Sequence, residues 1–122
     1  MATYKITASL NDTDNNVKEG SGTASFTSGA GEHMLKQEIG TSEEEITIAA
    51  DITGGNGPGY MYIENTDGTN YVEVGTATGV YWGKLDAGAR SVVELNSTVT
   101  SIFLKANTAA CDVRLKIIER GS

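Results

Sequence analysis

The sequence is poor in the residues on which many enzymes and secreted scaffolds depend. Its 122 residues include one cysteine, one histidine and one proline. Because Cys111 is the single cysteine, no disulfide can form within the chain, which argues against a disulfide-stapled extracellular scaffold. We therefore expect the protein to fold in a reducing cytoplasm.

Long hydrophobic runs and an excess of basic residues are also missing. No apolar segment approaches the roughly 20 residues of a membrane-spanning helix, and the initial MATYKITASL lacks the features of a signal peptide. Nine Lys and Arg against 16 Asp and Glu give a net charge of −7, and the cations are scattered along the chain. A field of this sign repels phosphate backbones. Neither a membrane nor a nucleic acid is expected as a partner.

Glycine, in contrast, is abundant, with 15 residues beside the single proline. This combination favours many tight turns between strands over disorder or a collagen-like repeat. Residues 3–10 show the period of two that is typical of a half-buried strand. The apolar positions of that segment are Tyr4, Ile6, Ala8 and Leu10.

Similar alternation recurs between turn signals and predicts nine or ten short strands. The segments are 3–10, 22–28, 33–40, 44–52, 59–65, 70–76, 79–85, 89–96, 100–107 and 111–119. Residues 33–40 could equally form a short helix ending at Gly40, but the surrounding β pattern favours a strand. The sequence therefore predicts one all-β domain over 1–122, an antiparallel β-sandwich with a jelly-roll-like topology.

Residues 62–75, YIENTDGTNYVEVG, have the pattern of a β-hairpin. Two alternating runs flank Asp67-Gly68, a pair that suits a tight turn with positive φ. Other connections, such as 86–88 and 107–110, are short as well. Successive strands are therefore expected to be antiparallel neighbours.

Few side chains are candidates for chemistry. Cys111 is in register with the apolar positions of the predicted last strand, which predicts a buried thiol that acts as a small hydrophobe and not as a nucleophile. His33 follows a glycine-rich loop, is expected at the surface or rim, and has no carboxylates at a recognisable metal-ligand spacing. The run Glu43–Glu45 could attract a cation, although a charged strand entry that discourages edge pairing is commoner.

Two polar loops match ligand-binding motifs only in part. In NDTDNN (11–16), the first three ligand positions of an EF-hand are occupied by Asp12, Asp14 and Asn16. Val17 then stands in place of the required glycine and Thr23 in place of the closing glutamate, so a solvated turn is predicted. GGNGPG (54–59) lacks the Lys-Ser/Thr pair and the following helix of a P-loop.

The sequence thus predicts a protein that is not an enzyme, with no catalytic residue, metal or cofactor. The sequence leaves open one catalytic arrangement, a pair of carboxylates as in a glycosidase, although so short a chain leaves little room for a cleft with a buried acid. Aromatic residues offer one binding hypothesis, because Tyr60 and Tyr62 share a face while Tyr81 and Trp82 lie on opposite faces of a strand. Tyr60, Tyr62 and Trp82 are therefore candidate contacts for a sugar or a protein partner; alternatively, at least one of these faces is core.

The last two-thirds of the chain, from about Ile39 to Glu119, resembles a group of small β-rich proteins encoded among the structural genes of tailed bacteriophages. The resemblance is carried by GYMYIENTDGTNYVEVG (59–75), WGKLDAGARSVVEL (82–95) and LKANTAACDVRLKIIE (104–119). Their order is similar to that of the group: a hairpin, a K-L-x-A-G-x turn and a final A-N-T-A-A-C hairpin. These strings describe turns and packing, so no catalytic or ligand-binding residue is carried over.

The resemblance implies a structural protein located in the virion, first of all a head decoration (cement) protein that clamps neighbouring capsid subunits. A neck, baseplate or fibre-attachment component is the alternative, and a carbohydrate-binding module is the competing interpretation. The implied partners are the major capsid protein or other virion subunits, with self-association left open. Residues 1–16, as a contact arm and loop, and GGNGPG are the expected contact regions.

Overall fold

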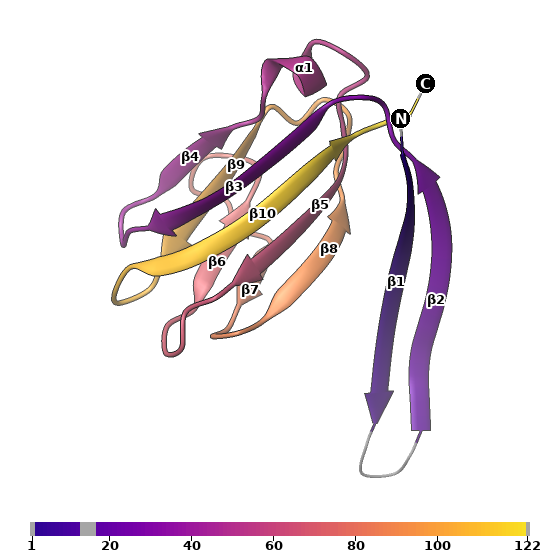
Figure 1. Cartoon of the computed structure of the whole chain (residues 1–122). Coiled ribbons are helices and arrows are strands. Elements are labelled where there is room, and N and C mark those ends of the chain that lie inside the picture. The colour runs from indigo at the N-terminus through magenta and orange to yellow at the C-terminus, as the bar shows by residue number, and fades with distance from the viewer. Residues whose placement is uncertain (1, 13–16, 122) are drawn as a thin grey trace.

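The computed structural model describes residues 2–12 and 17–121, which form ten strands and one single-turn helix (Figure 1). The elements are β1 (Thr3–Asp12), β2 (Val17–Thr27), β3 (Glu32–Ile39), β4 (Glu44–Thr47), α1 (Ala50–Thr53), β5 (Pro58–Asn65), β6 (Val72–Gly75), β7 (Gly83–Leu85), β8 (Arg90–Glu94), β9 (Ser101–Ala106) and β10 (Cys111–Glu119). The predicted all-β class and strand number are confirmed, and the ambiguous segment 33–40 is a strand. None of the described helical residues forms a helix that is long and apolar enough to span a membrane.

Eight of the strands form a sandwich of two antiparallel sheets, with strand orders β3-β10-β5-β8 and β4-β9-β6-β7 (Figure 1). Apolar side chains from both inner faces make a single core, which includes the fully buried Ile39, Met61, Ile102 and Ile117. A jelly roll has eight strands in two sheets, and this sandwich has the same number of strands and sheets. The jelly-roll topology itself stays a prediction.

The expectation that successive strands pair with each other is wrong for most of the sandwich. Among its described strands, β6 and β7 are the one consecutive pair joined by hydrogen bonds, and the other connections cross between the sheets. Packed sheets lie only about 10 Å apart, so a connection of a few residues can cross between them as easily as it can close a hairpin. Short loops therefore did not distinguish the two arrangements.

The segment 62–75 shows this error directly. Its two halves belong to β5 and β6, in different sheets, so it is not a hairpin. Gly68 does not have positive φ, which occurs instead at Gly57, Gly79 and Gly88. The connection is held by the buried Asn65, whose Nδ2 donates to the Asn70 and Leu85 carbonyls at 2.9 and 3.1 Å.

The predicted strand 44–52 is shorter than expected. β4 ends at Thr47, and residues 50–53 form the helical turn α1, which buries Ile52. The amides of Gly55 and Gly57 both donate to the Ile52 carbonyl at 3.0 Å, and Gly57 has φ of +84°. Part of GGNGPG is a loop, as predicted, but Pro58 and Gly59 already belong to β5.

The remaining two strands form a hairpin, β1–β2, that projects beyond the sandwich (Figure 1). The prediction of a half-buried strand for 3–10 is wrong in its outer part, because Leu10 is 70% exposed and Ala8 is exposed, while Tyr4 and Ile6 are half-buried. No second layer among the described residues covers the outer half. Asn11 and Asp12 were expected in a loop but continue β1. Residues 13–16, the rest of the segment that was compared with an EF-hand loop, lie outside the described residues.

Candidate partner-binding cleft

The hairpin is fixed to the sandwich through the linker 28–31, which runs along the end of β10. The Gly29 amide donates to the Glu119 carbonyl at 3.0 Å, and the Gly31 amide donates to Glu119 Oε1 at 2.8 Å. The other carboxylate oxygen accepts from the Asn56 amide at 2.8 Å. The backbone donors of Asn56 and Gly31 lower the pKa of Glu119. One buried carboxylate thus joins the linker, the α1–β5 loop and the central strand of a sheet.

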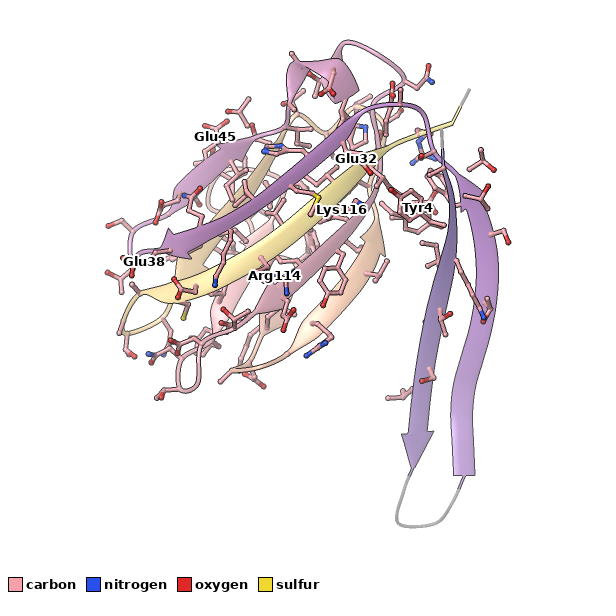
Figure 2. All side chains as sticks on the ribbon, viewed as in Figure 1. Tyr4, Glu32, Glu38, Glu45, Arg114 and Lys116 are labelled. Carbon is pink, nitrogen blue, oxygen red and sulfur yellow. The ribbon has the colours of Figure 1, made fainter. Side chains whose placement is uncertain are left out.

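Polar contacts hold the base of β1 against the outer face of the β3-β10-β5-β8 sheet. The Tyr4 hydroxyl donates to Glu32 Oε1 at 2.7 Å, and Lys116 Nζ lies 3.2 Å from the same oxygen. Lys116 Nζ also lies 5.0 Å from the centroid of the Tyr4 ring, and Figure 2 shows the three side chains gathered between hairpin and sheet. The hydrogen bond from Tyr4 and then the Lys116 ammonium lower the pKa of Glu32.

An aromatic contact holds the base of β2. Phe26 meets Tyr60 edge to face with ring centroids 4.8 Å apart. The Phe26 ring also covers Gly59 so closely that a Cβ at Gly59 would lie 2.5 Å from it. Both strands of the hairpin are therefore attached near the linker, whereas their outer parts extend away from the sandwich (Figure 1).

Beside the hairpin, the outer face of the sheet carries a cleft made of three adjoining hollows, of about 190, 380 and 420 Å³. Residues of β1 line the hollows of 190 and 420 Å³, whereas the hollow of 380 Å³ is lined by sheet strands alone. Tyr62 lines all three. Strand register places Tyr62 between Lys116 and Val92 in one row across the sheet, with Met34 beyond Lys116. Met34 is 65% and Val92 42% exposed, so this row presents apolar surface to solvent.

Cations surround this apolar row, and none of the described residues that line the three hollows is acidic. Five of the nine Lys and Arg residues of the chain line them: Lys5, Lys36, Arg90, Arg114 and Lys116. Glu64, beside the cleft, holds two of them, with its carboxylate oxygens 3.3 Å from Arg90 and 3.7 Å from Arg114. Tyr62 donates to Glu64 at 3.0 Å. Glu64 and Glu32 pair with three of the five cations, and Glu38 and Asp112 lie beyond Lys36 and Arg114 on the same face, outside the hollows.

The structure brings together two of the three predicted contact residues. Tyr60 and Tyr62 both line the cleft, whereas Trp82 lines a separate hollow of about 70 Å³ with core-side residues of β5 and β8. Trp82 is 50% exposed, as the sugar-binding hypothesis requires, but it forms no common platform with the two tyrosines. Its neighbour Tyr81 donates to Glu43, and this bond raises the pKa of Tyr81 to about 12.

The other residues singled out in the sequence have packing roles. Cys111 is fully buried, as predicted, and burial raises the pKa of its thiol. His33 is half-buried, and its Nδ1 accepts from the Ala49 amide at 3.1 Å. Glu43 and Glu45 accept hydrogen bonds from Gly79 and Ser101, at the entry of the edge strand β4. Within the described residues, no three His, Cys, Asp or Glu side chains gather in a way that could hold a metal.

Sequence reasoning missed the gathering of the cations. Lys36, Arg114 and Lys116 lie on the outward face of strands in which apolar and polar residues alternate. Their place on that face can be inferred from the period of two. Their proximity depends on β3 and β10 being neighbours, which the order of residues does not reveal. Comparisons with family models, with curated proteins and with solved structures found no match for this chain. The cleft is therefore interpreted from its geometry.

Proposed function

We propose that this protein is a non-enzymatic structural subunit of a bacteriophage virion, and that it decorates the head by binding neighbouring capsid subunits. The observation that supports this proposal best is the β1–β2 hairpin, which projects from the sandwich and carries exposed apolar residues such as Leu10. The hairpin and the cleft beside it form a surface for a macromolecular partner. The resemblance of residues 39–119 to tailed-phage structural proteins supports the choice of a virion.

A projecting hairpin has a physical cost that contact with a partner would offset. Two strands without a covering layer are marginally stable in water, and each of their outer edges leaves backbone donors and acceptors free to pair with another chain. Covering β1 and β2 would bury Leu10 and Ala8 and satisfy those edges. Binding of many copies to a symmetric shell would then add to the strength of each weak contact.

Quantitative mass spectrometry of density-purified virus particles tests the location and the copy number. A ratio to the major capsid protein near one, or a simple fraction of it, is the result expected of a head decoration protein. A few copies to a dozen or so would instead indicate the neck, baseplate or fibre attachment, which is the alternative within the virion. Absence from the particles would contradict the proposal.

The role of the hairpin is tested by substituting exposed apolar residues that do not support the fold. Leu10→Asp places a charge on the hairpin, and we expect it to reduce binding to particles that lack this protein. Val80→Asp is the matched control, because Val80 is 60% exposed in the β6–β7 connection and is not part of the hairpin. Equal binding by both variants and the unchanged protein would show that the hairpin is not the contact.

Carbohydrate binding is a second candidate, favoured by the exposed indole of Trp82. A sugar stacking on this ring would protect it from acrylamide and shift its fluorescence, and Trp82→Ala would abolish binding on a glycan array. Protection of Trp82 from acrylamide in the absence of sugar would argue against such a platform. Because Tyr60 and Tyr62 lie in another hollow, only one aromatic ring of the three is available at this position.

A further inference from the structure

We propose that the cleft between β1 and the β3-β10-β5-β8 sheet binds an extended, acidic polypeptide segment of a partner. This inference defines the chemistry of the partner in the proposed function, and it relies on that function only in regarding the partner as a virion subunit. It depends on three features of the cleft: the sign of its charge, its apolar row and the free edge of β8.

The sign of the charge is the first feature. The chain carries a net charge of −7, yet the described residues that line the cleft include five cations and no anion, and Glu64 and Glu32 pair with three of these cations from beside it. Arg90 and Arg114 are held by Glu64, and more than half of each arginine side chain is still exposed. Fixed and exposed cations of this kind favour a partner of opposite charge and discriminate against a basic one.

The free edge of β8 is the second feature. Within the described part of the chain, β8 pairs with β5 alone, so its other edge has no neighbouring strand. The 420 Å³ hollow lies along that edge and is lined by residues 7–9 of β1 and residues 90–92 of β8. An extended segment placed there can pair with the backbone of β8, in the manner of β-strand addition.

The apolar row determines what else the segment carries. Val92 lies on β8 itself and Tyr62 on the neighbouring β5, and Ile6 of the hairpin lines the same 190 Å³ hollow. A segment in which acidic side chains alternate with apolar ones satisfies both kinds of surface, because successive side chains of a strand point to opposite faces. Nucleic acids carry negative charge without such apolar side chains, and the overall field of this protein repels them.

The hairpin of a second copy matches the cleft less well. The β1 and β2 sequences, TYKITASLND and VKEGSGTASFT, each contain one basic and one acidic residue. With Asp14 of the connection, residues 3–27 have two basic and three acidic residues, and a net charge of −1 offers little for the five cations to attract. We therefore assign the cleft to an acidic segment of a different chain.

The test uses the full chain labelled with ¹⁵N and a synthetic peptide in which Glu alternates with Val and Ile. We expect amide shifts in residues 4–9 and 90–94, with affinity that weakens as salt is raised. The same peptide with Lys in place of Glu is expected not to bind. Shifts centred on β6 and β7, or equal binding of the two peptides, would overturn the proposal.

Charge reversal locates the site. Lys36→Glu combined with Arg90→Glu changes two exposed cleft cations, and we expect peptide affinity to fall by about tenfold or more, as for charge reversal across an interface. Lys84→Glu combined with Lys105→Glu makes the same change in net charge on the other sheet and is expected to bind as the unchanged protein does. Equal losses in both double variants would show that only the net charge matters.

Competing occupants are separated in the same titration. Tighter binding of an oligothymidylate or of an oligogalacturonate would contradict the polypeptide assignment and identify a nucleic acid or an acidic sugar instead. A dimer in sedimentation velocity that the peptide cannot dissociate would show that a second copy occupies the cleft. Peptide binding by a protein that is absent from virions would leave the cleft assignment intact and contradict only the proposed function.

Discussion

The sandwich and the hairpin are built from similar sequence patterns, yet only the sandwich has a core. Along β10, alternate residues from Cys111 to Ile117 are buried against a second sheet. Along β1, alternate apolar residues meet solvent toward the outer end, where Leu10 is most exposed. Alternation thus identifies a strand with one apolar face, but it does not show whether that face is covered by the same chain.

The difference indicates where each region obtains its stability. Sandwich strands are held by burial of apolar area, at about 25 cal/mol per Å², and by neighbours within the chain. The hairpin is held by its own ladder, by the contacts of Tyr4 and Phe26 and by the linker bound to Glu119. A region with so few buried contacts is expected to open locally without unfolding the rest.

The comparison is tested most strongly by removing apolar atoms from each region. Ile117→Ala leaves a cavity in the core between the two sheets and is expected to lower the free energy of unfolding by about 2–5 kcal/mol. Leu10→Ala, at an exposed position, is expected to change it by no more than about 0.5 kcal/mol. Urea denaturation followed by circular dichroism measures both. Similar losses would mean that the hairpin shares the core of the sandwich.

A smaller effect is expected at Glu119, which joins the two regions. Its pKa is lowered in the folded protein by the Asn56 and Gly31 amides, from an ordinary value of 4.5. Its contribution to stability is therefore complete above pH 4.5 and is lost as pH falls through the lowered pKa. Glu119→Gln is expected to be less stable than the unchanged protein at pH 7, and the gap should narrow on acidification. A gap independent of pH would show that the charge does not matter.

The smallest effect is expected for Tyr4→Phe, which removes the hydroxyl that donates to Glu32. The urea midpoint should stay unchanged, because no core contact is lost. Amide hydrogen exchange should become faster in β1 and β2 and stay the same in β10, since the change weakens attachment of the hairpin alone. Faster exchange throughout the protein would indicate that the two regions unfold together.

Much of the strand content could be predicted from the sequence, because a period of two is a local property. The segments of β9 and β10, which lie in different sheets, are clear for this reason. The segment 62–75 has an equally clear local pattern, but its two halves lie in different sheets, and the connection between them is held by Asn65, which donates to the carbonyls of Asn70 and Leu85. A bond between residues so far apart leaves no periodic signal.

The candidate cleft was predictable only in its aromatic residues. Tyr60 and Tyr62 could be placed on one face by their spacing, and they do line it. Trp82 could not be separated from them, because the assignment of neighbouring strands to different sheets depends on tertiary packing. The cations are scattered along the sequence, and their proximity also depends on tertiary packing, because Arg90 and Arg114 meet only through Glu64 on a third strand.

The attachment of the linker to β10 has a mechanical consequence. β10 is paired on both sides, with β3 and with β5, and is therefore an inner strand of its sheet. A force that pulls the hairpin reaches the sandwich through the linker, which continues directly into β3, an edge strand of the same sheet. The hydrogen bonds from Gly29 and Gly31 to Glu119 carry part of that force to β10, where the ladders on both sides resist a pull along the strand together.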